Sequence, residues 1–221
     1  MISSSAIFYF LDGIIVFGVS YKFFASFKKV RNSITRNFFI LFLGLSIGCF
    51  LWSIPVVLFP QNNFLLNFCS LLGEAFMFTG FAFGMRSFAA TRFPQISQNF
   101  VSFLTALSGA ALILSNAVTF GSSYLNPQGI IIWNFNAVAL CLFAFMVIVL
   151  TLPLAIEFFG TAKKVPETKI RYLLFGFASI LMGTGGILAV INIPWQMILF
   201  GHIILFLGVV LIGFATFFKK V

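Results

Sequence analysis

The chain has 221 residues, of which 61% are hydrophobic and only 8% are charged. Because a soluble globular domain is typically about 45–50% apolar and about 25% charged, this composition excludes a soluble fold and indicates an integral membrane protein. The formal net charge is +9. The basic residues are divided among clusters that flank apolar stretches, and this distribution excludes the single basic stripe of a nucleic-acid-binding protein.

A helix of about 20 apolar residues crosses the hydrocarbon core of a bilayer. Seven such runs follow one another with little chain left between them, so we predict an all-α bundle of seven transmembrane helices and no soluble domain. The first residues, MISSSAIFYFLDG, lack the basic region and cleavage site of a signal peptide, and we read them as the start of the first span. The predicted spans are residues 4–26, 37–59, 64–86, 99–119, 130–156, 170–191 and 196–218.

All basic residues lie in or beside alternate gaps between the spans. They are Lys22, Lys28, Lys29, Arg31, Arg36, Arg86, Arg92, Lys163, Lys164, Lys169, Arg171, Lys219 and Lys220. The other gaps, near residues 60–63, 120–129 and 192–195, carry no charge. Because basic loops stay on the cytoplasmic side during insertion, we expect a bacterial or archaeal inner-membrane protein whose N-terminus is outside and whose C-terminus is cytoplasmic.

Part of the sequence matches itself after a shift of 135 residues. Phe23-Phe24, Lys28-Lys29-Val30 and Arg36 align with Phe158-Phe159, Lys163-Lys164-Val165 and Arg171, and Phe42 and Gly48 align with Phe177 and Gly183. A loop shortened by seven residues then aligns Gly73, Phe78 and Gly80 with Gly201, Phe206 and Gly208.

This match predicts an internal duplication. We expect a first repeat at residues 1–95, a linker helix at 96–125 and a second repeat at 126–221. One linker span gives both three-helix units the same orientation, which is a parallel arrangement known in transporters. The alternative is that basic loops and glycine-containing spans resemble one another without a common origin.

Small residues follow one face of several predicted spans. The sixth span carries Gly176, Ser179, Gly183 and Gly186 at helical spacing. Helices in lipid gain little from hydrophobicity when they associate, so close approach at small residues supplies much of the packing energy. We therefore interpret this face as a contact within the bundle.

Ionisable residues inside the hydrocarbon are costly and usually functional. Only Asp12, Glu74 and His202 meet this description. We predict that they line an outward-open polar vestibule, with Asn116 and one of Asn134 and Asn136, and that this vestibule takes a small ligand or a proton. The alternative is that each of these side chains only makes local hydrogen bonds.

The sequence does not indicate an enzyme. A single histidine and four carboxylates cannot form a multi-histidine metal site or a bis-histidine haem site, and none of the common hydrolase, zincin or nucleotide-binding motifs occurs. The three cysteines, Cys49, Cys69 and Cys141, lie in predicted spans and are interpreted as small apolar filler. We therefore expect no cofactor and no metal.

The seven spans, outside N-terminus and duplicated layout resemble microbial rhodopsins, but the last span lacks the lysine that carries retinal in that family. The layout also resembles the SWEET and PQ-loop transporters. Their helix-embedded Pro-Gln is absent here, because Pro60-Gln61 and Pro94-Gln95 lie at span ends.

A third resemblance rests on a basic loop followed by an arginine and a span rich in leucine and glycine. The stretch from Lys163-Lys164 to Arg171-Tyr-Leu-Leu-Phe-Gly176, and that from Arg36 to Gly44 with Trp52, resemble the seven-span sensor region of bacterial histidine kinases. This resemblance implies a sensor. The chain ends shortly after its last span, so we expect signalling through a membrane or cytoplasmic protein partner.

Three functions therefore remain as hypotheses. The first is a stand-alone membrane sensor or binding module with an outward-facing pocket. The second is a small-solute transporter, for which the inner halves of the spans offer few polar groups beyond Ser20, Ser46, Thr79 and Thr151. The third is a structural subunit of a membrane complex, which would expose a face of small residues such as that of the sixth span.

Overall fold

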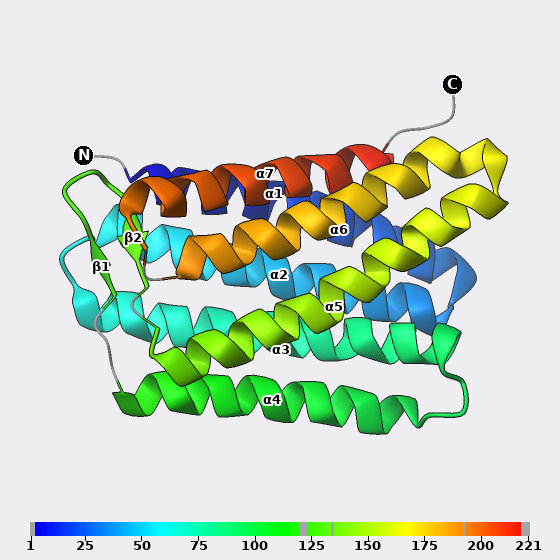
Figure 1. Ribbon diagram of the computed structural model, residues 1–221, viewed down its shortest axis with the longest axis horizontal. Coiled ribbons are helices and arrows are strands. Elements are labelled where there is room, and N and C mark those ends of the chain that lie inside the picture. Colours follow the sequence, from blue (N-terminus) through cyan, green and yellow to red (C-terminus); the bar gives the residue numbers. More distant parts are fainter. Residues whose placement is uncertain (1–2, 120–122, 134, 192, 218–221) are drawn as a thin grey trace.

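The computed structural model describes residues 3–119, 123–133, 135–191 and 193–217 as a bundle of long helices (Figure 1). A two-stranded hairpin covers one end of the bundle. The helices are α1 (Ser4–Val30), α2 (Ser33–Leu58), α3 (Asn63–Arg92), α4 (Gln98–Thr119), α5 (Ala137–Lys164), the 3-10 turn η1 (Pro166–Thr168), α6 (Lys169–Val190) and α7 (Trp195–Phe217). The strands are β1 (Tyr124–Leu125) and β2 (Ile131–Ile132), which pair antiparallel.

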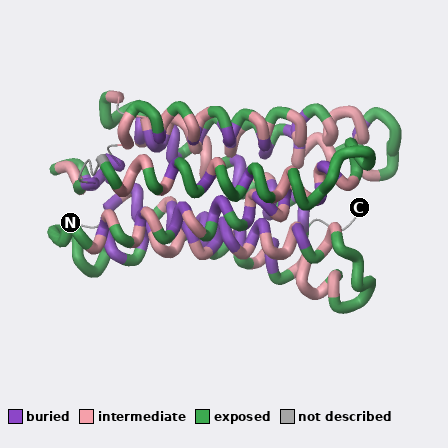
Figure 2. The backbone as a smooth tube through the Cα atoms, turned by 90° about the horizontal axis from the view of Figure 1, so that it is seen from below, coloured by how far each residue is buried: buried purple, intermediate pink, exposed green. Residues whose placement is uncertain are grey.

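The seven-span prediction is confirmed, since the described residues contain seven helices long and apolar enough to cross a membrane. Buried residues lie between the helices and exposed ones on the outside (Figure 2). Many of the exposed side chains are large and apolar, for example Phe10, Ile14 and Phe17 on α1. An apolar outer surface of this kind implies contact with lipid.

The predicted fifth span begins too early. α5 starts at Ala137, and residues 130–132 belong to the hairpin instead. The turn Asn126–Gly129 forces this outcome, because Gly129 adopts φ 76° and the Asn126 side chain accepts from the backbone N–H of Ile130 at 2.8 Å. The β-branched Ile131–Ile132 then suits a strand, although its apolarity alone also fits a span.

Three of the helices that end at the basic end continue beyond their predicted last residues. α1, α3 and α5 continue to Val30, Arg92 and Lys164. Hydropathy marks the hydrocarbon thickness, whereas a helix can extend beyond it into the headgroup region. Basic side chains in the last turns of these helices, Lys28, Lys29, Arg92, Lys163 and Lys164, favour this extension because they interact with the negative end of the helix dipole.

Six helices surround a common axis in the order α1, α2, α3, α5, α6, α7, and α7 packs back against α1. α4 lies outside this ring, against α3 and α5. The connections after α1, α3 and α5 gather at one end of the bundle, which we name the basic end (Figure 1). The opposite end holds the hairpin and the connections after α2 and α6, and we name it the uncharged end.

Glycines bring α2 and α3 into close contact. A methyl group placed on Gly80 would lie 2.8 Å from the carbonyl oxygen of Leu41, and one on Gly48 would lie 3.1 Å from that of Gly73. Neither position tolerates a side chain without moving a backbone, so the two helices pack with their main chains almost touching.

The α6–α7 hairpin repeats this packing. A methyl group on Gly208 would lie 3.1 Å from the carbonyl oxygen of Ala178, and one on Gly185 would lie 2.8 Å from that of Gly201. The two hairpins therefore share one register, in which α6 is two residues further along than the sequence alignment places it. In this packing Gly48 of α2 occupies the place that Gly185 occupies on α6, whereas the sequence alignment pairs Gly48 with Gly183.

The small-residue face of α6 lies inside the bundle. Gly176 packs against Phe159, and Gly183 packs against Thr151, both on α5. The interpretation of this face as an internal contact agrees with these neighbours. A structural subunit that offers the same face to a partner is not supported.

Replacing either matched glycine should loosen its hairpin. We expect Gly80→Ala and Gly208→Ala each to destabilise the protein by about 1–3 kcal/mol, because the added methyl group meets backbone atoms. Thermal unfolding in detergent measures the effect. Gly160→Ala is the control, since nothing lies within 4 Å of a methyl group at that position; equal melting temperatures for all three variants would contradict the close packing.

Candidate functional site

The hairpin closes the uncharged end of the bundle. Ser3 donates to the carbonyl oxygen of Gly129 at 2.7 Å, and the backbone N–H of Ile131 donates to the Ser5 hydroxyl at 3.2 Å. On the other side, the backbone N–H of Ser123 donates to the side-chain oxygen of Asn67 at 2.9 Å. The hairpin is thereby attached to both α1 and α3.

Four aromatic side chains form a layer beneath the hairpin. The indole N–H of Trp133 donates to the Tyr9 hydroxyl at 3.0 Å. The Tyr9 ring lies edge-on to Trp52 and to His202, with ring centroids 5.2 Å and 4.9 Å away. All four side chains are at most 4% exposed, so this layer separates the interior from the uncharged end.

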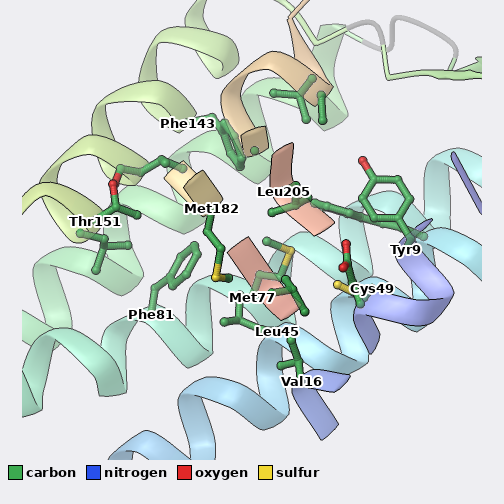
Figure 3. Close-up of a pocket in the computed structure, with 18 residues that line it drawn as sticks. Tyr9, Val16, Leu45, Cys49, Met77, Phe81, Phe143, Thr151, Met182 and Leu205 are labelled. Carbon is green, nitrogen blue, oxygen red and sulfur yellow. The ribbon is translucent and has the colours of Figure 1, made fainter. Parts of the chain in front are cut away.

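A cavity of about 100 Å³ lies directly below this layer, and we name it the central cavity. Its lining residues come from α1, α2, α3, α5, α6 and α7. Figure 3 shows how several of them surround it, among them Tyr9, Cys49, Met77, Phe143 and Leu205. Apart from Asp12, the Tyr9 hydroxyl, the Cys49 thiol, the Trp52 indole and the Thr151 hydroxyl, its lining is apolar.

A second cavity of about 390 Å³ continues towards the basic end, and we name it the basic-end cavity. Thr168, Arg171 and Tyr172 line its far side. The two cavities share the lining residues Leu45, Phe81, Leu150, Thr151 and Met182. The central cavity therefore adjoins the basic-end cavity on one side and the aromatic layer on the other.

The lining of the central cavity follows the predicted repeat. Fourteen of its 18 residues form pairs when α2 and α3 are aligned with α6 and α7 in the registers of their packing contacts, and α1 is aligned with α5 by the sequence shift of 135 residues. The pairs are Asp12 and Val147, Val16 and Thr151, Leu45 and Met182, Cys49 and Gly186, Trp52 and Ala189, Met77 and Leu205, and Phe81 and Val209. The faces that α1, α2 and α3 turn to the cavity thus match, position by position, those of α5, α6 and α7.

Asp12 lies on α1, one helical turn below Tyr9, and lines the central cavity. Asp12 is 1% exposed, and neither of its carboxylate oxygens has a hydrogen-bond partner among the described residues. Its repeat equivalent is the apolar Val147. Asp12 is thus the one member of the paired lining that brings a carboxylate to the axis.

Glu74 is equally buried but has partners. The Asn116 amide of α4 donates to both of its oxygens at 3.4 Å, and the Ser70 hydroxyl donates to one of them at 3.4 Å. Glu74 does not line either cavity. It therefore joins α4 to α3, which is a packing role for a polar group in the membrane.

His202 also has a local partner. Its Nδ1 lies 2.8 Å from the carbonyl oxygen of Ile198, one turn earlier on α7, and this contact makes Nδ1 the donor. Nε2 is buried and has no partner among the described residues. The ring packs against Phe8 and Tyr9, so His202 belongs to the aromatic layer.

The remaining predicted site residues lie apart from Asp12. Asn136 caps α5 by accepting from the backbone N–H of Ala139 at 2.9 Å and donates to the Ser115 carbonyl at 2.9 Å. Asn134 lies outside the described residues. The structure therefore distributes the described members of the predicted set over four places, and the hairpin covers the end at which the sequence predicts an open vestibule.

The sequence does not identify several of the residues that line the cavity as site residues. Met77 carries no signal of its own, Thr151 is noted only as a polar group in the inner half of a span, and Gly186 is noted only as part of the small-residue face of the sixth span. Tyr9 and Trp52 carry no signal beyond that of an interfacial and a packing aromatic residue. Their role in closing the cavity depends on Trp133, which lies far away in the sequence.

Among the described residues, no group of three or more histidine, cysteine, aspartate or glutamate side chains is placed to hold a metal ion. Comparison of the chain with protein-family models, with curated proteins and with solved structures finds no match. Function must therefore be inferred from the geometry of the two cavities.

Proposed function

We propose that this protein is a membrane-embedded binding module that senses a small, largely apolar molecule. The observation that carries the proposal is the pair of adjoining axial cavities, which end at a buried carboxylate and are closed by the hairpin. An enclosed, mostly apolar pocket with a few polar groups is the usual form of a small-molecule site.

The orientation follows from charge. Basic loops face the cytoplasm, so the basic end is the inner end and the N-terminus is outside. The ligand then enters from the cytoplasm or from the inner leaflet. This direction differs from the outward-facing pocket expected from the sequence, because the hairpin and its aromatic layer occupy the outer end.

Ligand binding in the cavities can change the positions of the ends of α3 and α5 at the basic end. Arg92 of α3 forms an ion pair with Glu157 of α5, and Glu157 also accepts from the Thr161 hydroxyl at 3.2 Å. Phe88 and Phe158, on the same two helices, line the basic-end cavity. A ligand that separates these side chains also moves the ion-paired helix ends, which offers a readout to a protein partner.

A small-solute transporter is the second candidate. The observation in its favour is the matched lining, since two equivalent units around one axis suit alternating access. A transporter must also open the uncharged end, which the β1–β2 hairpin covers, during its cycle. Flux of the ligand into proteoliposomes distinguishes the two functions, because a sensor binds without net transport.

The proposed orientation predicts a labelling pattern in intact cells. In a protein whose three cysteines are replaced by alanine, we expect Gln61→Cys to react with a membrane-impermeant maleimide because its loop lies at the uncharged end. Gln95→Cys, in the loop at the basic end, should react only after the cells are permeabilised. The reverse pattern would show that the bundle is inserted the other way round.

Filling the central cavity should remove ligand binding. Gly186 lines this cavity, and a methyl group placed on it would have nothing within 4 Å, so the side chain of Gly186→Leu extends into open space there. We expect 1-hexanol, as an apolar probe, to raise the melting temperature of the original protein but not of Gly186→Leu.

Gly160→Leu is the matched control, because Gly160 also has open space around it and lines neither cavity. This variant should respond to 1-hexanol like the original protein. If Gly186→Leu also responds fully, the axial cavity is not the binding site.

A further inference from the structure

We infer that the ligand is an apolar organic cation, such as an amine or quaternary ammonium with hydrocarbon substituents, whose positive charge pairs with Asp12. This inference rests on the proposed function and names the chemical class of its ligand. It starts from the one strongly polar group that the central cavity leaves without a partner among the described residues.

Burial and hydrogen bonding distinguish Asp12 from the other buried carboxylate. Both residues are 1% exposed. Glu74 receives hydrogen bonds from Asn116 and Ser70, whereas both oxygens of Asp12 lack a partner among the described residues. Buried polar groups without partners are uncommon and call for a missing one. Because Asp12 lines the central cavity, the missing partner has a place there.

The charge of the partner follows from the lining. Among the described residues of the central cavity, Asp12 is the one carboxylate, and none is lysine, arginine or histidine. An ionised carboxylate in apolar surroundings is costly unless a positive group pairs with it. A cationic ligand supplies that group. An anion would instead meet a second negative charge and no basic side chain.

The surroundings favour an organic cation over a metal ion. Hard metal ions take about six or more oxygen ligands. Besides Asp12, the lining offers only the hydroxyls of Tyr9 and Thr151, and these already bond to Trp133 and to the Val147 carbonyl. The rings of Tyr9 and Trp52 suit an alkylammonium group, whose charge is attracted to aromatic faces.

The structure also offers space for the hydrocarbon substituent of such a cation. Below the central cavity, Leu45, Phe81 and Met182 line the junction with the basic-end cavity. A chain that starts at Asp12 can pass this junction and continue among apolar side chains. The site therefore fits an elongated cation with its charged head at the closed end and its tail towards the basic end.

Hexyltrimethylammonium tests this inference, because its charge is permanent and its tail is apolar. Scintillation proximity on the immobilised full-length protein in detergent measures binding of the tritiated compound. We expect saturable binding that Asp12→Asn weakens by at least about tenfold, since the change removes the charge that pairs with the ligand. Glu74→Gln is the matched control and should bind within about twofold of the original protein.

The other outcomes separate the inference from the proposed function. Stabilisation of Asp12→Asn by 1-hexanol shows that this variant is folded and its cavity intact. If the cation still binds Asp12→Asn with full affinity, or if hexanoate competes as well as the cation does, the assignment of the ligand class is wrong although the cavity binds. If neither the cation nor 1-hexanol binds, the proposed function fails as well.

Discussion

Close approach of backbones at glycine is the constraint on which the rest of this structure depends. Lipid is as apolar as leucine, so helices gain little by burying leucine against leucine, and contact between main chains replaces the hydrophobic effect. The α2–α3 and α6–α7 hairpins meet this constraint in the same register, through Gly48 and Gly80 in one and Gly185 and Gly208 in the other. Between these two tight pairs, larger side chains line the axis and leave the cavities open.

The distribution of buried polar groups follows from this division. Where helices join, Glu74 with Asn116, and Asn136 with Ser115, form hydrogen bonds that attach α4 to its neighbours. On the axis, Asp12 has no such partner among the described residues. Carboxylates of equal burial thus differ in their surroundings, because Glu74 is hydrogen-bonded between α3 and α4, whereas Asp12 lines the central cavity.

The sequence predicts those features that depend on the solvent around the chain. Hydropathy and basic loops reveal the seven spans, because lipid and water act on each segment separately. The hairpin at residues 124–132 escapes prediction because its isoleucines satisfy both a strand and a span, and the Asn126–Gly129 turn decides between them. The separation of Asp12 from Glu74 escapes it because this separation depends on how each helix is rotated about its own axis, which only the packed bundle determines.

The prediction of an internal repeat also shows what the sequence leaves open until the packing contacts are known. Identities such as Lys28-Lys29 with Lys163-Lys164 predict a duplication, but the alignment built on them places α6 two residues away from its packing register. The contacts of Gly185 and Gly208 correct this register of α6. In the corrected register, most residues that line the central cavity fall into pairs. Sequence therefore predicts the seven spans, whereas the residues that line the cavities follow only from the contacts between helices.

Accessibility of the axis from each side tests the central claim most directly. Thr151 lines both cavities, so a cysteine at this position reports on the path between them. In proteoliposomes of known orientation, with the native cysteines replaced by alanine, we predict that a small cationic thiol reagent modifies Thr151→Cys only from the basic end. Modification only from the uncharged end would contradict the account, because the hairpin and its aromatic layer would then not close the site.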